Sequence, residues 1–171
     1  FASVFILFVT LAACSGGKKR SLSESASAFI QSNDQVIVFG SIDMMSILKK
    51  AEYKSVPKFG ELIESQIKRV KSGLNLDAGF YYAMEGPFEG GNPGTTYLFA
   101  EVKSFDSLKA VLMKDGYDFD SKDGIEYFRD GDASVGIKNG LAILFVKSGE
   151  YNEFEIAQKA FEMTEGDLLE G

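Results

Sequence analysis

Histidine and tryptophan are absent from this 171-residue sequence, and cysteine occurs once, at Cys14. The absence of histidine excludes Ser-His-Asp and Cys-His catalysis and the common histidine-containing zinc sites. The single cysteine excludes an internal disulfide and a thiolate metal cluster. We therefore expect neither a metal nor a cofactor. The composition favours a non-enzymatic role over an enzyme, although it does not rule out an enzyme that uses carboxylates.

Basic side chains are fewer than acidic ones. The chain has 18 Lys and Arg against 25 Asp and Glu, which gives a formal net charge of −7. A nucleic-acid-binding protein needs a basic face, so the sequence predicts no nucleic-acid partner. The length is sufficient for one domain with a sizeable hydrophobic core.

Residues 1–13 form an uncharged apolar run without proline or glycine. The run is too short to cross a hydrocarbon core of about 30 Å, which takes roughly 20 helical residues. Its length instead fits the apolar region of a signal peptide. An initiator methionine and a basic n-region are missing. We expect residues 1–13 to be a signal peptide that lacks its start.

Leu11, Ala12 and Ala13 directly precede Cys14, and this pattern resembles the lipobox of bacterial lipoproteins. The resemblance implies that the first three residues are recognised by a signal peptidase. It also implies that the Cys14 thiol receives a diacylglyceryl group and that its freed amine is then acylated. A thiolate is nucleophilic enough to form the thioether. Several acyl chains, at about 0.8 kcal/mol per buried CH₂, would anchor the protein stably in a membrane.

Serine and glycine are frequent in residues 15–28, and this composition predicts a flexible tether. We expect residues 14–28 to comprise the lipidated cysteine and its tether. Residues 29–171 should form one domain that is incomplete at its C-terminal end. Lys18, Lys19 and Arg20 could each gain about 1 kcal/mol against anionic headgroups. A solvated linker is the alternative interpretation of these cations.

Hydrophobic periodicity predicts strands and helices in alternation along the rest of the chain. Three dipeptides, Asp123-Gly124, Asp130-Gly131 and Asn139-Gly140, are typical of the tight turns of β-hairpins. The predicted strands cover residues 35–42, 79–85, 95–103, 117–121, 125–129, 132–138 and 141–147. The predicted helices cover residues 43–51, 57–72, 104–115 and 152–164.

This order predicts an α+β fold with a mostly antiparallel sheet and helices packed on one face. The first half has the rhythm of a split-βαβ unit. A β-meander and a C-terminal helix should follow it.

Aromatic residues on the predicted strands are one candidate site. Tyr82, Tyr97, Phe99 and Tyr127 would form a binding surface for an envelope protein or a glycan if one face of the sheet is open to solvent. Such aromatics also commonly cover a core, so both interpretations stay open at this point.

Acidic residues between positions 115 and 126 are the second candidate. Their spacing does not match the oxygen ligands of a calcium-binding EF-hand loop. Two carboxyl groups about 5–10 Å apart can hydrolyse a glycosidic bond, so a glycan hydrolase remains an alternative. The residues concerned are Asp115, Asp118, Asp120, Asp123 and Glu126.

Three segments, residues 35–48, 73–77 and 97–112, are similar to a family of secreted bacterial lipoproteins that carry a domain of unknown function. The family is common in gut-type Gram-negative bacteria, and the resemblance covers most of residues 29–165. It has no agreed activity, so it implies no catalytic residue. Family members are generally longer than this chain. Ser15, in place of an aspartate after the cysteine, implies sorting to the outer membrane.

We therefore expect a lipid-anchored cell-envelope protein, held at the membrane through the acyl groups on Cys14. Its domain should have a binding or structural role with an envelope protein or glycan as partner. An envelope glycan hydrolase with paired carboxylates is the alternative.

Overall fold

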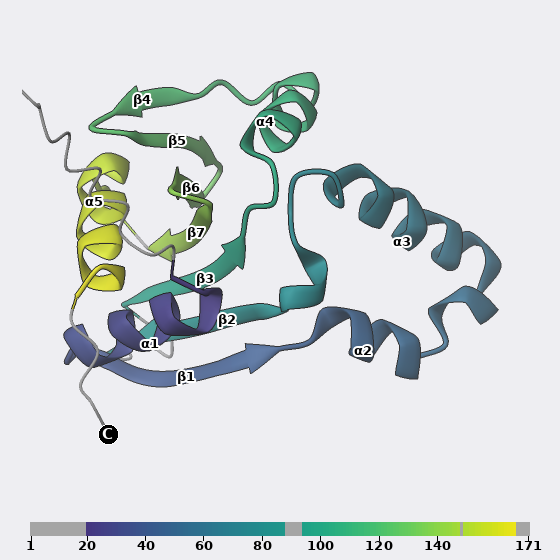
Figure 1. Cartoon of the computed structure of the whole chain (residues 1–171), viewed down its shortest axis with the longest axis horizontal. Coiled ribbons are helices and arrows are strands. Elements are labelled where there is room, and N and C mark those ends of the chain that lie inside the picture. The colour runs from purple at the N-terminus through teal and green to yellow at the C-terminus, as the bar shows by residue number, and fades with distance from the viewer. Residues whose placement is uncertain (1–19, 88–93, 148, 167–171) are drawn as a thin grey trace, which may run out of the picture.

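The computed structural model describes residues 20–87, 94–147 and 149–166. In these residues, helices and strands form an α+β fold, as the sequence predicts, with seven strands in one antiparallel sheet (Figure 1). The helices are α1 (Leu22–Ser32), α2 (Met44–Lys50), α3 (Pro57–Val70), α4 (Phe105–Lys114) and α5 (Glu153–Thr164), with 3₁₀ turns η1 (Tyr53–Ser55) and η2 (Leu76–Ala78). The strands are β1 (Val36–Ile42), β2 (Phe80–Glu85), β3 (Thr95–Glu101), β4 (Asp120–Lys122), β5 (Ile125–Asp130), β6 (Ala133–Lys138) and β7 (Leu141–Lys147).

The strand order is β1-β2-β3-β7-β6-β5-β4, and every neighbouring pair is antiparallel. This order corrects the expected split-βαβ first half, in which a helix would cross the sheet between parallel strands. The chain instead leaves the sheet after β1, forms α2 and α3, and returns beside β1 as β2. The predicted β-meander is present as β4 to β7.

One face of the sheet is covered by α1 and α5, which lie side by side (Figure 1). Phe29 of α1 is fully buried, and its ring centroid lies 4.8 Å from that of Tyr97 and 5.0 Å from that of Phe99. Close approach of α5 depends on Gly136 of β6, because a Cβ atom there would lie 3.0 Å from the Ala157 Cβ. Interlocking aromatic rings and small residues therefore join both helices to the sheet.

Helix α1 corrects the expected tether, because it occupies part of residues 14–28. Ser21 and Glu24 form a capping box: the Ser21 side chain accepts from the Glu24 N–H, and the Glu24 side chain accepts from the Ser21 N–H. Leu22, Ala26 and Phe29 follow at helical spacing and are buried. The high serine content conceals a helix whose buried face combines Leu22 and Phe29 with the small residues Ser25, Ala26 and Ala28. Residues 14–19 of the expected tether lie outside the described residues.

Arg20 joins the chain before α1 to the end of α5. Its guanidinium donates hydrogen bonds to the backbone carbonyls of Thr164, at 2.7 Å, and Gly166, at 2.6 Å. Carbonyls at a helix C-terminus lack intrahelical partners and carry partial negative charge, so a cation is favourable there. The sequence leaves Arg20 either to anionic headgroups or to a solvated linker, whereas in the structure it joins the start of α1 to the end of α5.

A smaller core lies on the opposite face, where Leu108 of α4 packs with Val102, Ile137 and Ala142. Alternation along β3 produces the two faces, because Phe99 points to α1 whereas Ala100 points to the α4 side. Helices thus contact both faces of the sheet, which corrects the expectation of helices on one face.

Glycine turns set the register of the meander. Asp123 and Gly124 both have positive φ, at 52° and 75°, and so do Asn139 and Gly140, at 52° and 80°. These values fit type I′ turns at two of the three predicted dipeptides. At the third, Gly131 has positive φ, at 61°, and Asp130 does not.

The position of each phenylalanine, in the core or on the surface, predicts how far its substitution by alanine lowers the free energy of unfolding. Phe99→Ala removes a fully buried ring and should lower the free energy of unfolding by about 3–5 kcal/mol. Phe59→Ala, at a side chain on α3 that is 49% exposed, should change it by only about 0.5 kcal/mol. Urea unfolding of both variants measures the difference, and equal effects would contradict the assignment.

Candidate binding site on the helical arm

Residues 43–71 form an arm, made of α2, η1 and α3, that projects from the sheet (Figure 1). Asp43 caps α2, because its Oδ1 accepts the Ser46 N–H at 2.8 Å. Glu52 adopts a left-handed conformation with φ of 47° and turns the chain out of α2. Pro57 then occupies the first turn of α3, where the missing N–H costs nothing. Local sequence signals therefore account for both helices and for the turn between them.

The base of the arm is fixed to the domain. Arg69 forms an ion pair with Asp115 at the end of α4. Gly73, just after the arm, allows the chain to approach α4, because a Cβ atom there would lie 2.6 Å from the Leu108 Cβ. The Asn75 side chain donates to the Glu101 carboxylate at 3.1 Å. These contacts are confined to the C-terminal end of α3 and the segment that follows it.

The rest of the arm exposes apolar side chains to solvent. Phe59 and Leu62 belong to the apolar face of α3, yet they are 49% and 55% exposed. Ile63 and Ile67, on the same face, are only half-buried. A contiguous exposed apolar patch on a soluble domain commonly marks an interaction site. The exposed apolar residues of the arm are Met44, Ile47, Val56, Phe59 and Leu62.

The arm is also the basic part of an acidic chain. It has seven Lys and Arg and four Asp and Glu, a net charge of +3, whereas the whole chain has −7. Lys54 and Glu64 form an ion pair at 2.7 Å. Their hydrogen bond raises the pKa of Lys54 and lowers the pKa of Glu64. Both groups therefore stay charged at neutral pH, and this pair does not change the arm's positive balance.

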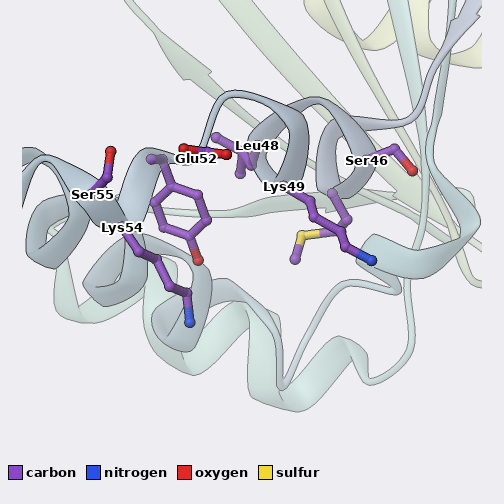
Figure 2. A pocket seen from close by; sticks show the side chains of 8 residues that line it. Ser46, Leu48, Lys49, Glu52, Lys54 and Ser55 are labelled. Atoms are coloured by element: carbon purple, nitrogen blue, oxygen red, sulfur yellow. The ribbon is translucent and has the colours of Figure 1, made fainter.

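A hollow of about 570 Å³ lies in the bend between α2 and η1 (Figure 2). Met45, Leu48 and Tyr53 contribute to its largely apolar wall. Lys49 and Lys54 extend to the same side of the arm beside it (Figure 2). This volume lies in the usual range for small-ligand sites, and the chemistry of the hollow, apolar with cations at its edge, matches the rest of the arm.

Two of the four predicted surface aromatics lie in the core instead. Phe99 is fully buried and Tyr97 is 5% exposed, both under α1. Tyr127 is half-buried against Phe154 of α5, and Tyr82 points to the opposite face of the sheet. The four residues therefore do not form one surface. Alternation had placed Tyr97 and Phe99 on one face, but the sequence did not show that α1 covers it.

The acidic residues of the predicted hydrolase site contact cations or lie exposed. Asp115 pairs with Arg69, and Glu126 accepts a hydrogen bond from Lys109 at 2.9 Å. The Lys109 hydrogen bond lowers the pKa of Glu126, whereas a general acid needs a raised pKa. Asp118, Asp120 and Asp123 are exposed. Among the described residues, no group of three or more His, Cys, Asp and Glu side chains could hold a metal ion.

Glu85 is a buried carboxylate that the sequence did not reveal as special. It lies at the end of β2 and accepts hydrogen bonds from the Asn33 amide at 2.8 Å and the Tyr97 hydroxyl at 3.2 Å. Burial raises the pKa of Tyr97, and the nearby Glu85 charge raises it further. Asn33 ends α1, so this cluster joins α1 to the β2–β3 strand pair. Its hydrogen bonds indicate a structural role.

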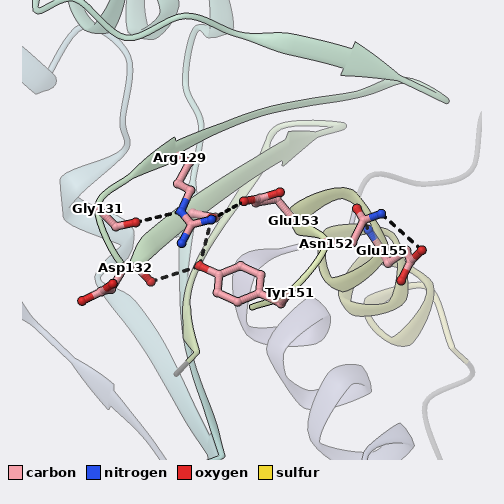
Figure 3. A network of polar contacts seen from close by, with 8 residues as sticks. Arg129, Gly131, Asp132, Tyr151, Asn152, Glu153 and Glu155 are labelled. Carbon is pink, nitrogen blue, oxygen red and sulfur yellow. Dashed lines mark hydrogen bonds and ion pairs between the residues drawn. The ribbon is translucent and has the colours of Figure 1, made fainter. Parts of the chain in front are cut away.

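A second polar network surrounds Arg129 (Figure 3). The guanidinium donates to the Gly131 carbonyl and to the Glu153 carboxylate, each at 2.8 Å, and lies 5.1 Å from the Tyr151 ring centroid. The Tyr151 hydroxyl donates to the Asp132 carbonyl at 3.1 Å. These contacts join the β5–β6 turn to the start of α5. Because each of these groups contacts another part of the chain, this network also has a structural role.

The pKa of Tyr97 predicts an alkaline loss of stability. The folded state holds the hydroxyl proton more tightly than the unfolded state, whose pKa is near 10.0. The contribution of the Tyr97 hydroxyl to the free energy of unfolding is therefore fully present below about pH 10. Above that pH it falls by about 1.4 kcal/mol for each pH unit. Tyr97→Phe keeps the ring but removes the titration, so its urea unfolding free energy should fall less steeply between about pH 10 and 12. Equal slopes in both proteins would contradict this account.

The close packing of η1 against Gly60 of α3 predicts the effect of a substitution at Gly60. Alanine at an exposed helical position normally stabilises a helix by about 0.8–1 kcal/mol relative to glycine. At Gly60, however, a Cβ atom would lie 2.9 Å from the Tyr53 carbonyl oxygen. We expect Gly60→Ala to detach η1, so that amide hydrogen exchange in residues 44–56 becomes faster. Ser65→Ala, on an exposed part of α3, is the control and should leave this exchange unchanged.

No family model, curated protein or solved structure matches this chain. The resemblance to secreted bacterial lipoproteins therefore stays a prediction from the sequence. The features that bear on function are those of the chain itself. In the domain, the feature that bears on function is the arm, which is fixed at its base, exposes apolar side chains and is basic in net charge.

Proposed function

We propose that this protein is a lipid-anchored cell-envelope protein whose domain binds a partner through the helical arm. The observation that carries the proposal is the exposed apolar face of α3, at Phe59 and Leu62. An amphipathic helix in a folded domain normally buries this face. Exposing it costs hydrophobic free energy, which association with a partner would recover.

The anchor rests on the sequence Leu11-Ala12-Ala13-Cys14, which lies outside the described residues. The similarity to a lipobox supports a diacylglyceryl group and a further acyl chain, such as palmitate, on Cys14. Ser15 supports sorting to the outer membrane. None of the described helices is both long and apolar enough to span a bilayer.

Binding is favoured over catalysis by the state of the carboxylates. Glu126 accepts a hydrogen bond from Lys109, and its pKa is lowered rather than raised. The buried Glu85 accepts hydrogen bonds from Asn33 and Tyr97. No observation on the described residues favours the alternative of a glycan hydrolase.

Photo-crosslinking in living bacteria tests the proposed binding arm. A benzophenone amino acid replaces Phe59 in one variant and Glu61 in the other. These positions are two residues apart and therefore about 200° apart around the helix. We expect an adduct from position 59 and much less from position 61, because only position 59 lies on the apolar face. The proposal of a binding arm fails if the two positions give equal yields.

The anchor is tested separately, with the same two variants purified from the bacteria. Mass spectrometry of their N-terminal peptide should show a chain that begins at a Cys14 carrying diacylglyceryl and acyl groups. The protein should fractionate with membranes. An unmodified Cys14, or retention of residues 1–13, would refute the anchor irrespective of the crosslinking result.

A further inference from the structure

Helix α3 combines the features of a helix that lies in the plane of a membrane interface. Such helices have a marked apolar face, a strongly charged opposite face and modest overall hydrophobicity. Phe59 and Leu62 are the exposed part of the apolar face of α3, and Lys58, Lys68 and Arg69 contribute to its polar side. With 14 residues, α3 is too short to cross a bilayer.

Other residues of the arm have the same chemistry. Met44, Ile47 and Val56 are exposed on α2 and on the turn before α3. Lys49 and Lys50 are exposed at the end of α2. The arm therefore offers apolar side chains and basic ammonium groups over both of its helices.

We infer that the arm binds the surface of an anionic lipid bilayer. Phe59 and Leu62 insert at the boundary between headgroups and acyl chains, and the lysines contact lipid phosphates. This inference deepens the proposed function and rests on it, because the arm is the proposed binding surface and Cys14 the proposed anchor.

Charge supports a bilayer over pairing of the arms of two copies. The arm has a net charge of +3 in a chain of −7. Two arms brought together would repel each other, whereas an anionic surface attracts basic segments within a Debye length. The remainder of the chain is acidic in net charge despite Lys18, Lys19 and Arg20, so the arm is the part of the domain that an anionic surface attracts.

The length of the chain between anchor and domain supports the same conclusion. Six residue steps separate Cys14 from Arg20, which is held against the end of α5. At no more than about 3.4 Å per residue, they span at most about 20 Å. An acylated Cys14 would therefore keep the domain next to the headgroups, so even weak affinity of the arm for lipid would be sufficient.

A fluorescent probe on the mature, full-length protein tests the inference. Phe59→Cys and, as matched control, Glu61→Cys are labelled with a nitrobenzoxadiazole dye and reconstituted into vesicles. Cys14 is the natural cysteine of the chain, and acylation leaves it without a free thiol. The vesicles contain phosphatidylcholine alone or an equal mixture with phosphatidylglycerol. We expect a blue shift and loss of iodide quenching at position 59 in the mixture only, and neither at position 61.

Lysine variants test the contribution of charge. Lys58→Gln together with Lys68→Gln should restore iodide quenching at position 59 in the mixed vesicles. Lys159→Gln, on an exposed part of α5, should leave the quenching low. Raising the salt concentration should act in the same direction as the two arm substitutions.

Three outcomes would overturn the inference. One is equal quenching at positions 59 and 61 in the mixed vesicles. Another is equal protection of position 59 in the two kinds of vesicle, because binding would then not need anionic lipid. The third is protection in detergent that grows with protein concentration, which would identify a second copy as the occupant. Dye on Cys14 itself, detected by mass, would instead show that the proposed anchor is absent.

Discussion

The contact of Phe29 with Tyr97 and Phe99 is the interaction on which the domain depends. It joins α1 to the centre of the sheet, and α5 then packs beside α1 over Ile125 and Ile143. Glu85 reinforces the same junction, because it accepts hydrogen bonds from Asn33, at the end of α1, and from Tyr97. A helix that the serine-rich sequence conceals is therefore essential to the core, and the domain includes residues from Arg20 onward, before the expected start at Phe29.

Much of the fold could be predicted because local signals coincide with the elements that they predict. Asp43 and Ser104 cap the helices that follow them, and Asn139-Gly140 turns the chain as its positive φ angles require. The order of the strands could not be predicted, because it depends on where α2 and α3 go after β1. Sequence periodicity shows that a helix has an apolar face, but it does not show what covers that face.

For the same reason, the sequence predicts the helices of the candidate site but not their exposure. The apolar face of α3 was visible in the spacing of Phe59 and Leu62, and its exposure was not. Tyr97 and Phe99 were correctly placed on one face of β3, yet that face is covered by α1. Conversely, the net charge of −7 conceals a basic arm, since an average over the chain says nothing about the distribution of charge. The charge of residues 43–71 can be counted in the sequence, but their projection from the sheet and their exposure are properties of the folded chain.

The hydrogen bonds of Arg20 have a mechanical consequence. They lie where the chain enters the domain, and they hold that point at the C-terminal end of α5. A force exerted through an anchor at Cys14 would therefore load the paired helices α1 and α5 before it reached the sheet. The arm joins the domain at other places, through β1, η2 and α4. A force on such an anchor would therefore act first on helices that are not part of the surface that we propose for binding.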